Sequence, residues 1–487
     1  MTVQLYNTLT RKKEELEPRI GNRLYMFVCG ITPYDYTHLG HAKTYIAFDT
    51  IVRYLRIRGY DVFYIQNVTD IDDNIIKRAK ETDTTEKELA EKFFNEFLTD
   101  MEALNVHSVD KFAKATDYIP EILAQIETLI EKGYAYESNG NVYFEVRKFE
   151  EFGKLSGQIL DELQAGARIE IDENKRNPED FALWKAHKEG EPYWESPWGK
   201  GRPGWHIEDT AISMTFFGDQ YDIHGGGPEL IFPHHDSEIA QAEACSGKVP
   251  FVKYWLHTGL LNVDGEKMAK SLGNFWTVKD ALNEFSPEAL RFFLVYAHYR
   301  SPIDFTREQI EDARKSYQRL QDTYNLIRRE LAKVESPEGK EPVRLTDMDE
   351  EMDTFRSDYY DAFITAMDDD FNTREAIANL FKLSTEVNKR LAGTTRQQIA
   401  YEVLARLEAD FKTYGRILGL FEQDELSGVE GETFKQLVDL LLEIRDDARK
   451  TKNFAEADRI RDKLKSMNIV IEDSVEGTNW KYSTEKK

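Results

Sequence analysis

The chain has 487 residues, with 64 Lys and Arg against 89 Asp and Glu, so its formal net charge is −25. This acidity argues against a protein that coats nucleic acid nonspecifically, although one locally basic face is compatible with it. The start, MTVQLYNTLTRKKEELEP, has no apolar signal segment, and no later run approaches about 18 apolar residues, so neither export nor a membrane partner is expected. The two cysteines, Cys29 and Cys245, fit a reducing compartment, and we predict a cytoplasmic location.

The first part of the chain alternates strand and helix signals. YMFVCGITPYD predicts a buried strand over residues 24–28 that ends at Cys29 and Gly30, and HLGHAKTYIAFDTIVRYLRIRG then has apolar residues at helical spacing up to Gly59. YDVFYIQNVTD predicts a second strand, and IDDNIIKRAKE begins another helix. A helix between two strands implies parallel pairing, so we predict an α/β fold with a doubly wound parallel sheet, Rossmann-like in type.

The remainder of the chain divides by composition. Residues 115–205 read as an insertion: a helix, a hairpin with its turn at Asn139 and Gly140, and a loop-rich stretch with Trp184, Trp194 and Trp198. The α/β pattern resumes with WHIEDTAISM, and from about residue 306 the chain is charged and helix-periodic. We predict a split catalytic domain (1–114 and 206–305), an inserted connective domain (115–205), a helical bundle (306–429) and a small C-terminal module (430–487).

Two motifs are candidates for binding phosphate. In HLGH, the residues His38, Gly40 and His41 stand where a loop leaving a strand opens a helix, a position that offers free backbone N–H groups and a positive dipole end to an anion. In GEKMAKSLGN, Lys267 and Lys270 flank a short loop from which they can neutralise the charge of a leaving pyrophosphate. Each motif alone fits an ordinary surface as well.

The segment FPHHDSE raises the possibility of a metal site. His234 and Glu238 are four residues apart, hence on one face of a helix, and both are zinc ligands in proteins. The alternative is a helix start in which Pro233 sets the first turn and the polar side chains are solvated. An acidic cluster elsewhere in the chain, Asp70, Asp72 and Asp73, is explained by negative charges in the first turn of a helix, without a metal.

Taken in order, the motifs carry a resemblance. The chain resembles the class I aminoacyl-tRNA synthetases, with HLGH for their HIGH signature and KMAKS for KMSKS, and among them it is similar to the cysteinyl-tRNA synthetases. The shared segments run from residue 29 to residue 482 and are CGITPYD, NVTDIDDNIIKRA, GRPGWHIE, DIHGGG, FPHHDSEIAQAEA, GEKMAKSLGNF, KNFAEADRIRDKL and EGTNWKY.

The resemblance implies a set of site residues. It implies one zinc ion per chain, held by Cys29, Asp209, His234 and Glu238. It implies that Gly30, Thr69 and Trp205 line a pocket for L-cysteine, with Trp205 as a wall. It also implies that magnesium ATP is a substrate, with His38, His41, Lys267 and Lys270 as catalytic residues and with ATP contacts from His38, Gly40, His41, Glu229, Lys267, Lys270 and Ser271.

The chain departs from the family pattern at three positions. Asp209 stands where bacterial members commonly have cysteine; a carboxylate is a legitimate zinc ligand but a harder one, and the alternative is that Asp209 only caps or solvates a turn. His235 could compete with His234 for the metal. Ala269 replaces the serine of KMSKS, and Glu229 replaces an aspartate that contacts the ATP ribose, so we expect altered rates more than lost activity.

The activity implied is that of a cysteine–tRNA ligase, with tRNA(Cys), L-cysteine and ATP as partners and no DNA. Zinc fits this activity because it binds thiolate far better than the hydroxyl of the competitor serine. Two alternatives are a tRNA-free cysteine ligase like the mycothiol-biosynthetic relatives, which the long helical tail and EGTNWKY argue against, and a noncatalytic binding protein, which intact HLGH, both loop lysines and Cys29 argue against.

Overall fold

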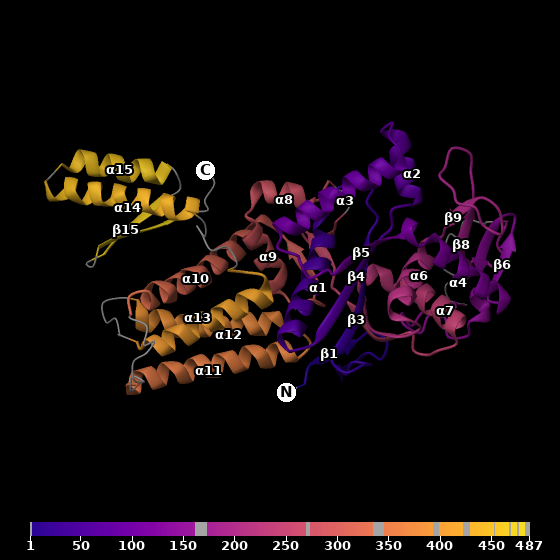
Figure 1. Ribbon diagram of the computed structural model, residues 1–487, viewed down its shortest axis with the longest axis horizontal. Coiled ribbons are helices and arrows are strands. Elements are labelled where there is room, and N and C mark those ends of the chain that lie inside the picture. Colours follow the sequence, from indigo (N-terminus) through magenta and orange to yellow (C-terminus); the bar gives the residue numbers. More distant parts are fainter. Residues whose placement is uncertain are drawn as a thin grey trace. The chain divides into compact units, whose positions relative to one another are not determined.

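A computed structural model describes residues 2–160, 173–268, 273–334, 345–392, 399–421, 429–451, 453–466, 469–474 and 477–482. The chain forms two compact units, Met1–Leu420 and Phe421–Lys487 (Figure 1). Among the described residues, no helix combines the length and the apolar character that a bilayer crossing requires.

A five-stranded parallel sheet forms the centre of the first unit, in the order β11-β10-β3-β4-β5. Every neighbouring pair runs parallel, which confirms the predicted doubly wound core. The strand predicted over residues 24–28 is longer than expected, because it continues through Cys29 and Gly30. At these two residues its pairing with the neighbouring strand β4 is irregular. The strands are β3 (Arg23–Ile31), β4 (Asp61–Val68), β5 (Lys111–Lys114), β10 (Tyr221–Gly226) and β11 (Val252–His257).

Helices cover both faces of this sheet (Figure 1). On one face, α1 (Leu39–Ile57) packs its Phe48 ring against Gly225 of β10. A Cβ on residue 225 would lie 2.3 Å from that ring, which explains why residue 225 is glycine. On the other face, Phe27 packs with residues of α6 (Trp205–Phe217) and α7 (Asp236–Ser246) in one buried cluster. Since side chains alternate along a strand, Cys29 projects from β3 toward α6 and α7 like Phe27.

The insertion has its own four-stranded antiparallel sheet, in the order β6-β7-β8-β9. The predicted hairpin is confirmed: β6 (Ala135–Ser138) pairs with β7 (Asn141–Phe144), and Asn139 and Gly140 both have positive φ in the turn. Trp184 is fully buried in β8 (Phe181–Ala186), beside β9 (Gly201–Pro203), and α4 (Ile119–Glu131) packs on the same core.

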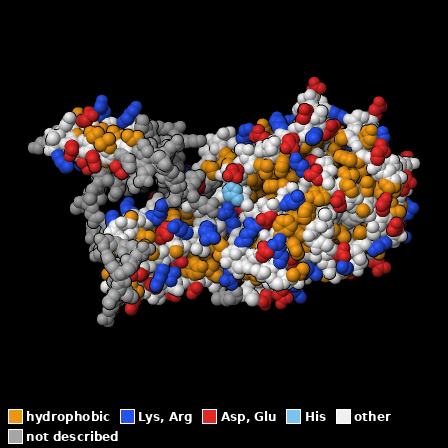
Figure 2. Space-filling model, viewed as in Figure 1, with side chains coloured by type: hydrophobic (Ala, Val, Ile, Leu, Met, Phe, Trp, Pro, Cys, Tyr) orange, Lys and Arg blue, Asp and Glu red, His pale blue; other side chains and the backbone are white. Residues whose placement is uncertain are grey.

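Four long helices complete the first unit, as the charged periodic sequence predicts: α10 (Arg307–Leu331), α11 (Asp347–Asp368), α12 (Thr373–Leu391) and α13 (Tyr401–Leu418). Although the whole chain is acidic, Lys and Arg side chains are grouped over these helices on the face drawn in Figure 2. The smaller elements are β1 (Gln4–Asn7), β2 (Lys12–Glu15), α2 (Asp73–Glu81), α3 (Glu86–Ala103), β12 (Leu261–Val263), β13 (Glu266–Lys267), α8 (Val278–Glu284), α9 (Pro287–Tyr296) and β14 (Ile303–Phe305).

The second unit is a helix pair with a hairpin. It consists of α14 (Val429–Lys450), α15 (Phe454–Ser466), β15 (Ile469–Ser474) and β16 (Gly477–Tyr482). The EGTNWKY segment supplies β16, and Trp480 donates its indole N–H to Asp439 at 3.0 Å. A small apolar core of Val438, Leu442, Ile460, Leu464 and Ile469 explains why this unit is compact.

Candidate metal centre and nucleotide site

Cys29, Asp209, His234 and Glu238, the four predicted metal ligands, lie together in the interior. They come from β3, α6, the wide helical turn η4 (Ile231–His235) and α7, and their donor atoms all lie within 4.8 Å of one another. The His234 Nε2 atom is 3.1 Å from Asp209 Oδ2 and 3.1 Å from Glu238 Oε1, and Cys29 Sγ is 3.4 Å from Asp209 Oδ2. The fold therefore brings the four donors together, with His234 and Glu238 on one helical face.

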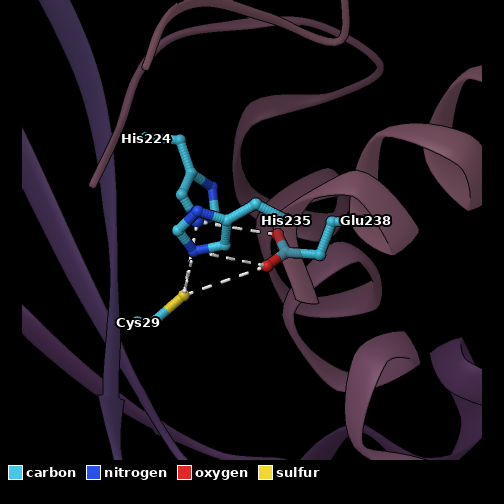
Figure 3. A group of neighbouring side chains, drawn as sticks. All are labelled: Cys29, His224, His235 and Glu238. Carbon is cyan, nitrogen blue, oxygen red and sulfur yellow. Dashed lines mark hydrogen bonds and ion pairs between the residues drawn. The ribbon is translucent and has the colours of Figure 1, made fainter. Parts of the chain in front are cut away.

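A second group of donors shares two of these residues. Figure 3 shows His224 of β10 and His235 of η4 converging on Cys29 and Glu238. The Nε2 atoms of His235 and His224 are 3.1 and 3.4 Å from Cys29 Sγ. His235 is thus a neighbour of the centre, as the sequence suggests. No sequence argument points to His224, although both His224 and His257 stand near the carboxyl ends of parallel strands, where such a fold places its sites.

The histidines of the centre are oriented through their other ring nitrogens. His235 Nδ1 lies 2.8 Å from His257 Nε2, and His257 Nδ1 lies 2.8 Å from the Thr8 hydroxyl. His234 Nδ1 is 2.7 Å from His206 Nδ1. One nitrogen of each ring is engaged in this way. The Nε2 atom of His234 is therefore directed at the Glu238 carboxylate and that of His235 at the Cys29 thiol, as is usual for histidines that bind a metal.

Burial disfavours the charged forms of the titratable side chains in this interior. Burial, followed by Glu238 and Asp209, raises the pKa of the Cys29 thiol well above its ordinary value. Burial and then Asp209 raise the pKa of Glu238, while burial lowers the pKa of His224 and His235. Three acidic side chains and neutral imidazoles in one buried cluster form a donor set that fits a divalent ion such as zinc.

The residues predicted to line a cysteine pocket border this centre. Trp205 is the first residue of α6, its ring stacks on His234 with centroids 4.1 Å apart, and it is 39% exposed, so it separates the metal group from solvent. Gly30 and Thr69 stand at the ends of the adjacent strands β3 and β4. Asn67, which the sequence argument missed, donates to Asp209 and accepts from the Gly30 N–H.

Glu208 is a further buried residue that the sequence argument missed. It directly precedes Asp209 in α6 and is 1% exposed, yet among the described residues neither of its carboxylate oxygens has a hydrogen-bond partner within the usual distance. Burial, then Asp209, raises its pKa well above the ordinary value, while the nearby Thr69 hydroxyl acts in the opposite direction. The spacing of residues within a motif gives no sign of such a group, because its isolation depends on what surrounds it.

The HLGH motif forms the start of α1, as predicted. His38 is the N-cap, and its Nδ1 atom accepts the backbone N–H of His41 at 3.2 Å. The two imidazoles stack with centroids 3.6 Å apart. Burial, and then His38, lowers the pKa of His41 well below its ordinary value, so this ring is neutral at pH 7.

The KMAKS region lies beside that helix start. Lys267 is exposed in β13, whereas Lys270 and Ser271 lie outside the described residues. Downstream of the loop, the Trp276 carbonyl accepts from Leu39 at 3.1 Å, and Val278 donates to the Thr37 carbonyl at 2.8 Å. A Cβ on Gly40 would lie 2.9 Å from His38 Nδ1 and 3.7 Å from Met268, so the two motifs meet at this glycine.

Glu229 and Lys43 lie on the same side of the unit. Glu229 is exposed after β10, in the short turn η3 (Pro228–Leu230). Lys43 of α1 is buried and donates to the carbonyls of Gly259 and Tyr299 at 2.7 and 3.1 Å. Burial lowers the pKa of Lys43 to about 8, and Glu229 partly opposes this shift, which places the glutamate within electrostatic reach of α1.

The acidic cluster after β4 has structural roles. Asp72 caps α2, Asp70 accepts from the N–H and hydroxyl of Thr116, and Asp73 pairs with Lys185 and Arg202. Asp72 therefore serves the start of α2, as predicted, and Asp73 takes part in ion pairs with the neighbouring basic side chains.

Comparison with known families and structures agrees with this arrangement. Residues 15–315 match the class I (C) tRNA synthetase catalytic domain, residues 362–422 the DALR domain, and residues 433–480 the cysteinyl-tRNA ligase anticodon binding domain. The chain is 51% identical to the cysteine–tRNA ligase of Thermococcus onnurineus and 47% identical to that of a Geobacillus species, over 99% of each chain in both cases. The fold of Mycobacterium tuberculosis methionyl-tRNA synthetase in complex with methionyl-adenylate matches 81% of this chain and 89% of its own, with a TM-score of 0.59 and 18% identity.

Proposed function

This chain belongs to the family of cysteine–tRNA ligases, and from that premise we propose that its buried Cys29 cluster holds one zinc ion that selects the substrate. The protein is an aminoacyl-tRNA synthetase of class I that acts on L-cysteine, ATP and tRNA(Cys). The match of residues 433–480 to an anticodon-binding domain of this family argues against a tRNA-free cysteine ligase. Location in the cytoplasm and the absence of a DNA partner stay predictions.

The zinc ligands we propose are Cys29, Asp209, His234 and Glu238. Both candidate groups have suitable donors, but they differ in surroundings: His234 is stacked under the partly exposed Trp205, whereas His224 is fully buried and stacks on Trp255 at 4.5 Å. Only the first group therefore borders a surface that a substrate can reach. Zinc bound there supplies a Lewis acid that lowers the pKa of a substrate thiol and prefers thiolate to hydroxyl.

The chain's own residues then orient the amino acid. We assign Gly30, Thr69 and Trp205 to the cysteine pocket, since all three adjoin the Cys29 group, and Trp205 closes it toward solvent. A thiol held at the centre leaves its carboxylate free to reach a nucleotide. Serine fills such a pocket sterically but offers the poorer donor, so selection occurs at binding.

The nucleotide site we propose lies at the start of α1. His38, Gly40 and His41 face the ATP phosphates there, Lys267, Lys270 and Ser271 approach from the KMAKS loop, and Glu229 contacts the ribose. The cysteine carboxylate attacks the α-phosphorus, the bond to pyrophosphate breaks, and the two lysines neutralise the leaving group, with magnesium as the counterion of ATP. A terminal hydroxyl of tRNA then attacks the carbonyl of cysteinyl-adenylate and releases AMP.

The observation that carries this proposal is the burial of four zinc-type donors within 4.8 Å of one another beside Trp205. It is tested by zinc analysis of the purified protein together with charging of tRNA(Cys) and cysteine- or serine-dependent ATP–pyrophosphate exchange. We expect about one zinc per chain and exchange with cysteine only. A protein that charges tRNA(Cys) without bound zinc would contradict the metal assignment while leaving the activity intact.

The choice between the two donor groups is tested by a matched pair of variants. Asp209→Ala removes a donor of the first group only, and His224→Ala removes a donor of the second group only. We expect the first change to lower zinc affinity and cysteine selectivity together, and the second to retain zinc. The opposite pattern would assign the metal to the deeper group.

A further inference from the structure

Asn67 joins three elements of the active site at one buried side chain. It lies in β4 and is 3% exposed. Its Oδ1 accepts the backbone N–H of Gly30 in β3 at 2.6 Å, and its Nδ2 donates to Asp209 Oδ1 of α6 through a short hydrogen bond. The same Nδ2 is 3.4 Å from the Thr69 hydroxyl. One amide therefore connects the residue after Cys29 with a second proposed ligand.

The orientation of this amide follows from its partners. The Gly30 N–H can only donate, so the Asn67 atom that faces it must be the carbonyl oxygen. The NH₂ group is then necessarily directed at Asp209, where it donates to a buried carboxylate. The assignment of oxygen and nitrogen is thus fixed by the hydrogen bonds themselves.

The two oxygens of Asp209 consequently have different surroundings. Oδ1 is occupied by Asn67, whereas Oδ2 lies 3.1 Å from His234 Nε2 and 3.4 Å from Cys29 Sγ. Only Oδ2 is directed at the donor group. A carboxylate with both oxygens free can bind a metal through either or both of them, so the hydrogen bond to Oδ1 restricts the ligand to one oxygen.

We propose that Asn67 is a positioning residue that presents Asp209 to the metal as a one-oxygen ligand. This inference rests on the proposed zinc centre. It applies particularly to a chain with aspartate at residue 209, because a thiolate, the donor suggested there by the family resemblance, has a single ligating atom and needs no such selection. Asparagine at residue 67 thus removes the choice between two ligating oxygens that an aspartate at residue 209 introduces.

Gly30 makes the geometry more stringent. A Cβ at Gly30 would lie 1.7 Å from the backbone carbonyl oxygen of Asn67. The backbones of β3 and β4 therefore touch beside Cys29, and no residue larger than glycine fits at residue 30. Asn67 is therefore held by its own backbone as well as by its amide. Its position relative to Cys29 is set by the sheet, so the amide that donates to Asp209 starts from a fixed backbone, as a supporting residue for a metal ligand requires.

The test is a double-mutant cycle read out as zinc affinity. The four proteins are the wild type, Asn67→Ala, Asp209→Cys and the double variant, all kept reduced and titrated with zinc against a chromophoric chelator. We expect Asn67→Ala to lower zinc affinity by about 10- to 100-fold when residue 209 is aspartate. In the Asp209→Cys background we expect the same change to cost less than about 3-fold, which the cycle records as coupling between the two residues.

A second readout reports the coordination directly. Cobalt(II) substituted for zinc absorbs more weakly when its coordination number rises above four, so Asn67→Ala should weaken the visible absorption if the freed oxygen also binds. Asn67→Leu serves where the alanine variant folds poorly, because it keeps a branched side chain of similar shape but cannot donate to Asp209. It too should lower zinc affinity by at least about 10-fold.

The outcomes separate the two proposals. Equal losses of zinc affinity in both backgrounds, or no loss with Asn67→Leu, would overturn the positioning role while leaving the zinc centre in place. A wild-type protein that binds no zinc would instead overturn the centre itself. Coupling of the expected sign together with weaker cobalt absorption supports the role of Asn67.

Discussion

The proposed metal centre and the proposed nucleotide site are built in opposite ways. Every proposed zinc ligand is at most 6% exposed, and the histidines and Asp209 are held by further hydrogen bonds from His206, His257 and Asn67. At the nucleotide site, Lys267 and Glu229 are exposed, on β13 and η3. The first is thus assembled in the fold before any substrate arrives, whereas the second presents charged groups that a polyanion can draw in.

This difference matches what each site has to recognise. Cysteine and serine differ in one atom, so discrimination requires donors fixed to within fractions of an ångström. The triphosphate carries several charges and is recognised largely by its electrostatics, to which the exposed Lys267 and the helix start contribute. Substitutions at the two sites should therefore separate metal content from catalytic rate.

The largest effect is expected from Cys29→Ser. Cys29 belongs to both candidate donor groups, and a serine hydroxyl is a much weaker zinc ligand than a thiolate. We expect loss of bound zinc and loss of cysteine-dependent ATP–pyrophosphate exchange together. Metal analysis and exchange assays on the same preparation check this. Retained zinc would show that the thiol is not a ligand.

Lys270→Ala should affect the other site alone. If the lysine neutralises the leaving pyrophosphate, its removal should slow exchange by about 10²- to 10³-fold. Zinc content and cysteine binding should stay at wild-type levels, because the metal centre is complete without the loop. A rate unchanged from the wild type would remove Lys270 from the catalytic residues, and lost zinc would show that the two sites are not independent.

Much of this organisation could be predicted from the sequence, and the reason is local. The alternation around β3 and α1, the hairpin turn at Asn139 and Gly140, and the i, i+4 spacing of His234 and Glu238 depend on nearby residues, and the fold confirms each of them. Periodicity and turn chemistry are sufficient for such features. The assignment of Cys29 and Asp209 to the same cluster came from the family resemblance instead.

The supporting residues could not be predicted in this way. Asn67 contacts Asp209 across 142 positions of the chain, and His257 contacts Thr8 across 249. Neither residue type is unusual at its position, so only the packing of β4 on α6 and of β11 beside the N-terminal segment reveals the contacts. Glu208 could not be predicted for the same reason, because the lack of hydrogen-bond partners for its carboxylate among the described residues depends on the packing around it.

Removal of the terminal unit tests the division between chemistry and tRNA binding. A cut at residue 306 is unsuitable, because Arg291 donates to the Leu418 carbonyl at 2.7 Å and to Asp49 at 2.6 Å, which joins the bundle to α1. Deletion of residues 421–487 leaves the first unit whole. We expect charging of tRNA(Cys) at limiting tRNA to fall by about 10²-fold, since one of two linked binding modules is lost.

The control for this deletion is cysteine activation measured without tRNA. It should stay within about 2-fold of the wild type, because the proposed zinc and ATP residues all precede residue 421. Wild-type charging by the shortened, folded protein would show that the terminal unit does not contribute to tRNA binding.

The smallest effect is expected at Trp205, which borders the metal centre on its exposed side. Its ring stacks on His234 with centroids 4.1 Å apart, and such aromatic pairs contribute about 0.5–1.5 kcal/mol, equivalent to about 2- to 10-fold in affinity. Trp205→Ala should therefore raise KM for cysteine by about that factor and leave zinc bound, because the four donors remain. Trp205→Phe keeps an aromatic face over His234 and should recover most of the loss. If instead both variants lost zinc, Trp205 would be needed to hold His234 in place. The four buried donors would then not be sufficient to bind the metal. A change in kcat with KM unaltered would place Trp205 nearer the reacting carboxylate than the thiol.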